Sequence, residues 1–222
     1  MGSIKKLRLL CLHSFRTSAH IFQKQMERAM WTQHFEEQLD MVFLDAPHQA
    51  AGPSDVAAVY DPPYFEWANL SDDRKEFRGI DDTIAYVTDY LTMHGPFDGL
   101  MGFSQGAIVS SILVALQQKG AVLQGVPPLR CCVFVGGGRS RAEAFRDLYE
   151  TPIRCPSLHL IGDNDFMKLS SQKLASAFQN PTVVRHPQGH VVPKLDDAAL
   201  KACQIFFARI QEAAQEHRVS AL

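Results

Sequence analysis

Short, continuous apolar runs alternate with longer amphipathic segments along almost the whole chain. The apolar runs have lengths typical of buried strands and fall at residues 7–12, 41–44, 99–103, 130–135, 157–161 and 182–185. The segments with helical periodicity fill residues 19–31, 79–93, 105–118, 168–178 and 196–213. Strands that are apolar on both faces are typical of a parallel sheet with helices packed on each side. The pattern therefore predicts an α/β fold with a mostly parallel central sheet and helices on both of its faces.

The most specific chemical motif is Gly-Phe-Ser-Gln-Gly at 102–106, a G-x-S-x-G pentapeptide between the strand at 99–103 and the helix at 105–118. A strand, a tight turn and a helix are the context of a nucleophile elbow, in which a serine projects from the carboxyl edge of a sheet. The flanking glycines are expected to let the backbone bend sharply. Ser104 is therefore the candidate nucleophile. The alternative is a serine in an ordinary glycine-rich turn.

A serine hydroxyl is a weak nucleophile, so it needs a base and an acid that orients the base. In α/β-hydrolases the acid follows the serine along the chain and the histidine comes last. The run at 182–185 ends at His186, and a loop with Gly189 and His190 follows. Catalytic groups collect just after strands in open α/β sheets. We expect His190 to be the base, because Gly189 gives its loop freedom, whereas His186 is expected to pack at the end of the strand.

The candidate acid lies in the turn Gly-Asp-Asn-Asp at 162–165, just after the strand at 157–161. Such a turn usually uses one aspartate to accept hydrogen bonds from its own backbone amides. Asp163 is nearer the glycine and is expected to do so, which leaves Asp165 to reach the histidine. The residues alone give only a preference between the two aspartates.

Four stretches of the chain, two of them already described, together resemble the motifs of a known family. They are Leu-His-Ser-Phe-Arg-Thr-Ser at 12–18, Gly-Phe-Ser-Gln-Gly at 102–106, Gly-Asp-Asn-Asp at 162–165 and Gly-His-Val-Val-Pro at 189–193. Taken together they resemble the motifs of the small serine hydrolases of the FSH family, and the likeness extends from about residue 6 to about residue 210. The resemblance implies that 1–222 is a single α/β-hydrolase domain. It also implies a triad of Ser104, Asp165 and His190 that cleaves carboxylic esters or thioesters.

The loop after the first strand departs from the family pattern. Hydrolases of this kind usually carry His-Gly there, whereas this chain has His13 and Ser14. The loop normally lends one backbone N–H to the oxyanion hole, and the residue after the nucleophile lends the other. Carried over to this chain, the two donors are the amides of Phe15 and Gln105. Serine tolerates fewer backbone conformations than glycine, so the substitution is harmless only if φ at Ser14 is negative.

The segment at 46–78 is the main insertion, and it combines prolines with a cluster of aromatic residues. Long irregular loops in compact domains are usually functional or disordered, and this composition favours a packed cover over the active-site edge. We expect the segment to line the acyl pocket, with Tyr64, Trp67 and His13 as tentative pocket residues. The alternative is a flap that packs on the core and touches no substrate.

Composition and charge limit the classes of binding partner that the sequence predicts. The net charge is −2 and the isoelectric point is about 6.5, so no broad basic surface favours nucleic acid or an anionic membrane as partner. No run approaches the roughly 18 apolar residues that a membrane span needs. The first residues lack the apolar run of a secretory signal peptide, so we expect no such signal. Ser-Ala-Leu at 220–222 lacks the central basic residue of a peroxisomal signal. We therefore predict a cytoplasmic or nuclear enzyme with a small-molecule substrate, of undetermined oligomeric state.

The cysteines and histidines do not form a recognisable metal site. Five cysteines lie mainly in apolar runs, which favours free, buried thiols in a reducing compartment. His186 and His190 are four residues apart, but Pro187 and Gly189 prevent the helix that would bring both to one metal. We expect neither a metal nor a cofactor.

Three functions fit these observations. The first is an esterase or thioesterase for small to medium or longer acyl groups, with Ser104 as nucleophile, His190 as base and Asp165 as the orienting acid. The second is an acyltransferase or polyketide-releasing enzyme that uses the same triad. The third is a ligand-binding protein on a hydrolase scaffold, which the intact set of three residues disfavours.

Overall fold

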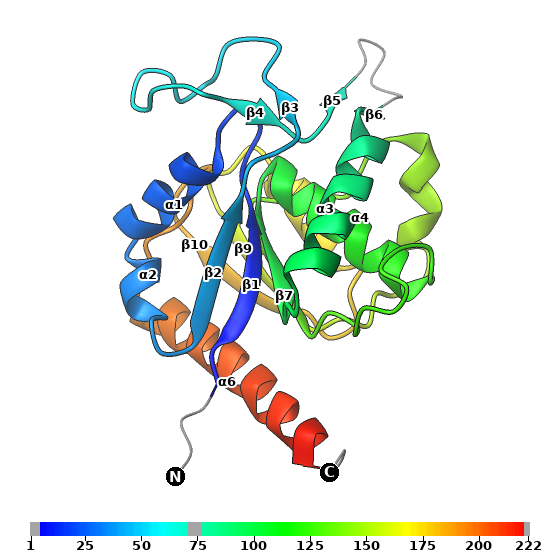
Figure 1. The fold of residues 1–222 in the computed structure, drawn as a ribbon. Coiled ribbons are helices and arrows are strands. Elements are labelled where there is room, and N and C mark those ends of the chain that lie inside the picture. The colour runs from blue at the N-terminus through cyan, green and yellow to red at the C-terminus, as the bar shows by residue number, and fades with distance from the viewer. Residues whose placement is uncertain (1–4, 71–76, 220–222) are drawn as a thin grey trace.

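A parallel sheet forms the centre of the molecule (Figure 1). The computed structural model describes residues 5–70 and 77–219, so part of the insertion and the Ser-Ala-Leu end lie outside the described residues. The six strands are ordered β10-β9-β8-β7-β1-β2, and every neighbouring pair is parallel. They are β1 (Leu7–Leu12), β2 (Leu39–Leu44), β7 (Gly99–Phe103), β8 (Cys131–Val135), β9 (Ser157–Gly162) and β10 (Thr182–His186). The predicted α/β fold is confirmed, and the predicted strands agree with these to within two residues at each end.

Helices cover both faces of the sheet (Figure 1). They are α1 (Ala19–Arg28), α2 (Trp31–His34), α3 (Ile80–His94), α4 (Gln105–Gln118), the 3₁₀ helix η1 (Glu143–Tyr149), α5 (Lys168–Ala175) and α6 (Asp197–Val219). Successive side chains of a strand point to opposite faces, so Leu9 and Cys11 pack with α1 and α6 while Leu10 and Leu12 pack with α3 and α4. The sheet thus lies between two hydrophobic cores, which explains why its strands are apolar on both faces.

The helix predicted at 19–31 is two helices in the structure. α1 ends at Arg28, and Met30, with φ of 66°, takes the left-handed conformation before α2 begins at Trp31. A left-handed residue without glycine is uncommon, and here Trp31 is fully buried and its ring N–H donates to the carbonyl of Pro193 at 2.9 Å. The burial of Trp31 is a tertiary contact, which the local sequence pattern does not reveal.

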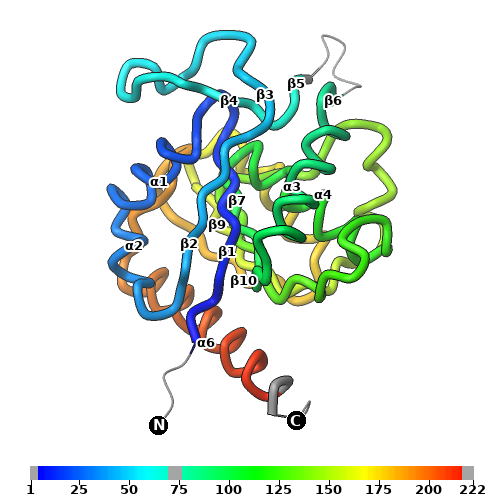
Figure 2. Tube along the Cα trace, viewed as in Figure 1, coloured from blue at the N-terminus to red at the C-terminus, as the bar shows by residue number. Residues whose placement is uncertain are grey.

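The order of the strands places a crevice at the carboxyl edge of the sheet. From β1 the chain passes to β2 on one side, and after α3 it returns to β7 on the other side of β1. The loops after β1 and β7 therefore diverge, which is the arrangement in which open α/β sheets bind their ligands. The trace of the chain shows the loop after β1, in dark blue, at the upper end of the strands and beneath the insertion (Figure 2).

The insertion lies over this same edge, at the top of the molecule in Figure 1. Predicted as an irregular stretch, it contains two short antiparallel pairs of strands. β3 (His48–Gln49) pairs with β4 (Phe65–Glu66), and β5 (Asn69–Leu70) pairs with β6 (Phe77–Arg78). An isolated bridge also joins Thr17, in the loop after β1, to Phe65.

Candidate active site

Ser104 occupies the turn between β7 and α4 in a strained backbone conformation. Its φ is 52° and its ψ is −111°, a conformation that residues with a side chain adopt only where the surrounding structure enforces it. Its amide donates to the carbonyl of Val135 at 2.9 Å, which ties the turn to the end of β8. The sharp strand-to-helix turn is the geometry of a nucleophile elbow.

The two glycines of the elbow are required for space rather than for a left-handed backbone. Neither Gly102 nor Gly106 has a positive φ. A Cβ on Gly102 would collide with the backbone of the first turn of α4, and a Cβ on Gly106 would collide with the carbonyl oxygen of Leu12 in β1. The predicted sharp bend is present, but the residue that takes the unusual conformation is Ser104 itself.

His190 lies between Ser104 and an aspartate. Its Nε2 is 2.9 Å from Ser104 Oγ, and its Nδ1 is 3.0 Å from both carboxylate oxygens of Asp165. The side chain of Asp165 is 2% exposed and that of His190 is 18% exposed. An ionised carboxylate only accepts hydrogen bonds, so Nδ1 carries the proton and Nε2 is left free to accept from the serine hydroxyl. This arrangement can take a proton from Ser104 and hold the resulting charge.

The two candidate aspartates have separate environments, although both belong to the turn after β9. Asp165 accepts from the amide of Met167 at 2.6 Å in addition to facing His190. Asp163 forms ion pairs with Arg185 and Lys168 instead, and the Arg185 hydrogen bonds are the main cause of its lowered pKa. We expected Asp163 to accept from the amides of its own turn, and this expectation was wrong. Asp163 is paired at the surface, and only Asp165 reaches the imidazole.

His186 does not join this cluster. It ends β10 as a buried side chain, and its Nδ1 is among the buried polar atoms without a hydrogen-bond partner in the described part of the chain. Burial lowers the pKa of His186 from its usual value, against the opposing effect of Asp165 and Asp163. The prediction that this histidine packs at the end of its strand is confirmed.

Gly136, which the sequence analysis did not single out as a site residue, lies directly behind the imidazole–carboxylate pair. Its φ is 53°, and a Cβ there would be 3.0 Å from Asp165 Oδ2 and 3.0 Å from His190 Nδ1. Two aromatic rings flank His190 as well, Phe103 at 5.1 Å and Phe166 at 4.5 Å between ring centroids. The signal in the sequence that could have indicated this position is the run of three glycines at 136–138, directly after β8.

The amides of Phe15 and Gln105 belong to the two loops that meet beside Ser104. Gln105 is the first residue of α4, where backbone N–H groups have no acceptor within the helix. The amide of Phe15 donates to no acceptor among the residues that the structure describes. Ser14 is not among the described residues with positive φ, so serine fits that position without strain. The left-handed residue of this loop is Arg16, with φ of 53°.

A cavity of about 780 Å³ opens beside Ser104 and His190. Its other lining residues come from the loop after β1, from α1 and its C-terminal end, from residues 55–60 of the insertion, from the end of β7, and from the loops after β9 and β10. They are Ser14, Phe15, Thr17, Gln25, Arg28, Ala29, Asp55, Val56, Val59, Tyr60, Phe103, Phe166, Gln188, Val191, Val192 and Lys194. Phe15, Phe103, Phe166, Val191 and Val192 bring apolar surface to this lining, so part of the cavity is suited to a hydrocarbon chain.

The three tentative pocket residues do not line this cavity. Trp67 is fully buried, and its ring N–H donates to the carbonyl of His13 at 2.8 Å. Tyr64 donates its hydroxyl to the carbonyl of Tyr60 at 2.5 Å. The part of the insertion that lines the cavity lies earlier, at 55–60. The expectation for these residues was wrong, because Trp67 is bonded to the loop after β1 and Tyr64 is bonded within the insertion.

His13 joins the loop after β1 to the start of the insertion. It is fully buried, its Nε2 accepts from the amide of Ala46 at 3.0 Å, and its Nδ1 lies 2.8 Å from the carbonyl of Ser14. Burial lowers the pKa of His13 to about 4. The ring is therefore neutral near pH 7, which leaves Nε2 able to accept.

Other features of the described residues bear on the function. No group of three histidine, cysteine or acidic side chains among them is arranged to hold a metal ion. No described helix has the length and apolar composition to cross a bilayer. The five cysteines are free thiols, and burial raises the pKa of Cys203 to about 12, so this thiol is not a nucleophile near neutral pH.

The chain is similar in sequence to known serine hydrolases and esterases. The family model described as "Serine hydrolase (FSH1)" matches residues 1–202. Esterase OVCA2 of Danio rerio is 31% identical over 209 residues, which cover 84% of this chain and 90% of that protein. Esterase OVCA2 of Homo sapiens is 30% identical over 218 residues, which cover 87% and 92%. A dihydrofolate reductase of Schizosaccharomyces pombe is 30% identical over 207 residues, but the match spans only 44% of that protein.

The fold is also that of solved hydrolases. Acyl-protein thioesterase 2 of Zea mays superposes with a TM-score of 0.62 at 20% identity, and the match covers 93% of this chain and 95% of that one. Esterase PE8 superposes with a TM-score of 0.60 at 18% identity and covers 95% and 96%. These likenesses show an α/β-hydrolase fold. With the family match, they identify the chain as an ester-hydrolysing enzyme that belongs to the serine hydrolase (FSH1) family.

Proposed function

We propose that this enzyme cleaves carboxylic esters or thioesters through a catalytic triad of Ser104, His190 and Asp165. The observation that carries the proposal is the continuous set of contacts from Ser104 Oγ to His190 Nε2, at 2.9 Å, and from His190 Nδ1 to Asp165, at 3.0 Å. These distances are within the range over which a base can take a proton from a serine. The positions after β7, β9 and β10 bring all three groups to one edge of the sheet.

The reaction follows from these contacts. Ser104 Oγ attacks the acyl carbon while His190 Nε2 accepts the hydroxyl proton, and Asp165 stabilises the imidazolium that forms. The amides of Phe15 and Gln105 stabilise the negative oxygen of the tetrahedral intermediate. His190 then gives its proton to the leaving alcohol or thiol, and an acyl-enzyme remains. Water, deprotonated by the same imidazole, releases the acid and restores Ser104.

The cavity supports acyl groups of small to medium length. Its volume of about 780 Å³ lies within the range of roughly 300–1,000 Å³ that is usual for small-molecule sites. Val56, Val59 and Tyr60 bring apolar surface from the insertion to a cavity that also contains the candidate nucleophile. We propose that these three side chains, rather than Tyr64 and Trp67, set the preference for acyl length.

Replacement of the nucleophile tests the proposal. Ser104→Ala should abolish labelling by a fluorophosphonate probe and lower kcat for a p-nitrophenyl ester by about 10⁴- to 10⁶-fold, because triad members act as a unit. The control is Ser170→Ala, which removes a serine on α5 outside the cavity lining. This variant should keep both the labelling by the probe and the kcat of the parent enzyme. Activity of Ser104→Ala within tenfold of the parent enzyme would contradict the assignment.

The same assay separates the alternative functions. A ligand-binding protein with an inactive triad would not be labelled by the probe at all. An acyltransferase would be labelled, but with an added alcohol or amine it would transfer the acyl group in preference to hydrolysing the ester. Product analysis at increasing acceptor concentration therefore distinguishes transfer from hydrolysis.

A further inference from the structure

Both proposed oxyanion donors depend on one short segment of the insertion, residues 65–69. The amide of Phe65 donates to the carbonyl of Thr17 at 2.6 Å, and the ring N–H of Trp67 donates to the carbonyl of His13 at 2.8 Å. These two bonds lie on either side of Phe15 along the chain. The loop that carries the first donor is therefore attached to the insertion at both of its ends.

A partly buried ion pair fixes the middle of the same loop. Arg16, the residue after Phe15, donates from Nε to Glu66 Oε2 at 3.0 Å, and the side chains are 20% and 5% exposed. Arg16 has φ of 53°, which residues other than glycine adopt at an energetic cost because Cβ crowds the backbone. The second oxygen of Glu66 accepts from Asn69 Nδ2 at 3.0 Å. Glu66 is therefore fully engaged, and one of its two partners is the strained residue.

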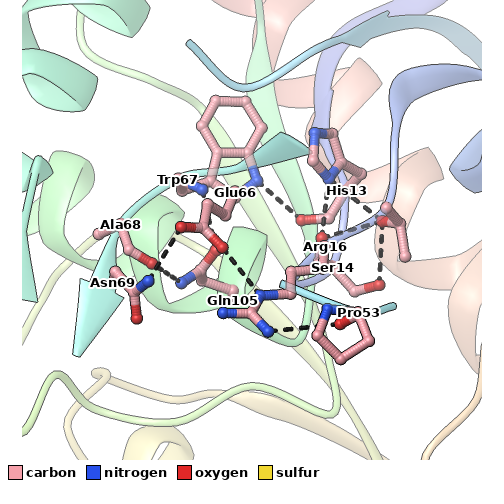
Figure 3. A network of polar contacts seen from close by, with 10 residues as sticks. His13, Ser14, Arg16, Pro53, Glu66, Trp67, Ala68, Asn69 and Gln105 are labelled. Atoms are coloured by element: carbon pink, nitrogen blue, oxygen red, sulfur yellow. Dashed lines mark hydrogen bonds and ion pairs between the residues drawn. The ribbon is translucent and has the colours of Figure 1, made fainter. Parts of the chain in front are cut away.

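The second donor is attached to the same segment through its own side chain. Gln105 Oε1 accepts from the amide of Trp67 at 2.9 Å, and Gln105 Nε2 donates to the carbonyl of Ala68 at 2.6 Å. The Gln105 side chain is buried and satisfied at both ends. Figure 3 draws these contacts together, with one dashed line from Glu66 to Arg16 and another from Ala68 to Gln105. Both loops of the oxyanion hole thus meet a single piece of backbone.

We propose that Glu66 is a positioning residue for the oxyanion hole, acting through Arg16. The inference rests on the proposed function. The ion pair offsets the energetic cost of the left-handed conformation of Arg16. It thereby keeps the turn in which the amide of Phe15 faces the reacting carbonyl. Gln105 sets the distance between this loop and the elbow. Glu66 itself does not line the cavity. Its effect should therefore appear in the stabilisation of the intermediate and not in the binding of substrate.

Glu66→Leu removes both acceptor oxygens with little change in volume. We expect kcat to fall by about 10- to 100-fold, less than the 10²- to 10³-fold that follows complete loss of one oxyanion donor, with KM within threefold of the parent value. An alkyl boronic acid that mimics the tetrahedral intermediate should bind more weakly by the same factor. A ketone isostere of the ground-state ester, which lacks the negative oxygen, should keep its affinity. Glu66→Gln retains one acceptor oxygen and should recover part of the loss.

A double-mutant cycle tests whether Glu66 acts through Arg16. Arg16→Gly removes the ion pair, but glycine adopts a positive φ without strain. If the ion pair serves to hold this conformation, Arg16→Gly combined with Glu66→Leu should lose no more activity than Glu66→Leu alone. Asp98→Asn is the matched control, because Asp98 is a partly buried carboxylate that pairs with Arg130 and accepts from the amide of Arg8 far from the cavity. It should lower the melting temperature without changing kcat.

Three results would overturn the proposal. They are an unchanged kcat in folded Glu66→Leu or Glu66→Gln, a loss confined to KM, and additive losses in the cycle. If Glu66→Leu does not fold, Glu66→Gln and Arg16→Gly provide the same kcat and boronic acid measurements. An active Ser104→Ala enzyme would contradict the proposed function, whereas normal boronic acid affinity in Glu66→Gln would contradict only the role of Glu66.

Discussion

The loops at the carboxyl edge of the sheet and the insertion at 46–78 serve the same site in different ways. Each edge loop brings one polar side chain, and these side chains contact one another: Ser104 after β7, Asp165 after β9 and His190 after β10. Among the described residues of the insertion, none is hydrogen-bonded to Ser104 Oγ. Residues 55–60 of the insertion contribute to the lining of the cavity, and its residues 66–68 are buried against the two loops of the proposed oxyanion hole.

The difference follows from how each region is held. A residue directly after a buried parallel strand is fixed by the register of that strand with its neighbours, so its position follows from the sheet. A long insertion makes its own contacts, and one stretch can face solvent while the next, a few residues later, enters the core. Changes at the edge should therefore act on the chemistry. Changes in the insertion should act on selectivity or on the position of the backbone.

The largest expected difference separates two aspartates of one edge loop. Asp165→Asn should lower kcat by about 10⁴-fold, because the imidazole then loses the acceptor that fixes its tautomer. Asp163→Asn should keep most of its turnover but melt at a lower temperature, because it loses the ion pairs with Arg185 and Lys168. Steady-state kinetics and thermal melts of both variants at pH 7 are the measurement. A slower Asp163→Asn enzyme beside an active Asp165→Asn enzyme would reverse the assignment.

The pH dependence sharpens the test on Asp163. Arg185 and Lys168 lower its pKa in the folded state, so its contribution to stability is present above the unfolded value, about 3.9. That contribution is lost as the pH falls through the lower folded pKa. The difference in melting temperature between parent and Asp163→Asn should thus be largest near pH 7 and shrink below about pH 4. A difference that persists at lower pH would argue for another role of this carboxylate.

Gly136→Ala should displace the imidazole of His190 or the carboxylate of Asp165 and so lower the activity. The new Cβ would lie 3.0 Å from both Asp165 Oδ2 and His190 Nδ1, and a shift of about 1 Å in a catalytic group can cost roughly 10²-fold in rate. Gly120→Ala is a matched control, because Gly120 also has a positive φ, 71°, but no atom lies within 4 Å of the new Cβ. Both variants should lose stability, and only Gly136→Ala should lose about 10²-fold in kcat/KM. Equal kinetics in the two variants would mean that the pair tolerates the methyl group.

Two tyrosines of the insertion should differ in their effect on selectivity. Tyr60→Ala enlarges the cavity and should shift the ratio of kcat/KM for octanoyl and acetyl esters by roughly tenfold, the usual size of a change in apolar pocket contacts. Tyr64→Ala makes the same substitution outside the lining and should leave this ratio unchanged. Values of kcat/KM across a series of p-nitrophenyl esters give this ratio for both variants. A larger shift for Tyr64→Ala would restore the expectation from the aromatic cluster.

The smallest expected effect concerns His13, which joins the two regions by accepting from Ala46. Its pKa of about 4 in the folded state lies below the unfolded value of about 6.5, so the unfolded chain gains a proton first as the pH falls. Stability should therefore decrease between about pH 6.5 and pH 4, by of order 1–2 kcal/mol at pH 5 for this group. His13→Gln should be less stable at pH 7 but lose less on acidification, as denaturant titrations at pH 7.5 and pH 5 would show. An equal loss in both proteins would exclude His13 as a cause.

Much of the architecture could be predicted from local sequence. Buried parallel strands are apolar on both faces, so their positions can be recognised without knowledge of their neighbours. The G-x-S-x-G pentapeptide at 102–106 is likewise a local motif, and it predicted that Ser104 lies between a strand and a helix. The structure has β7 and α4 there. The break at Met30 and the short strands of the insertion were not predicted, because both depend on what they pack against.

The sequence by itself determined the α/β fold, the order of its elements and the candidate residues at the ends of its strands. Only the tertiary structure decided that Asp165 rather than Asp163 faces His190, that Arg16 rather than Ser14 takes the left-handed conformation, and that residues 55–60 line the cavity. Short-range patterns specify which segments are buried and where they turn. The contacts between particular side chains depend on strand register and on packing between segments far apart in the chain. A local sequence pattern does not specify these contacts.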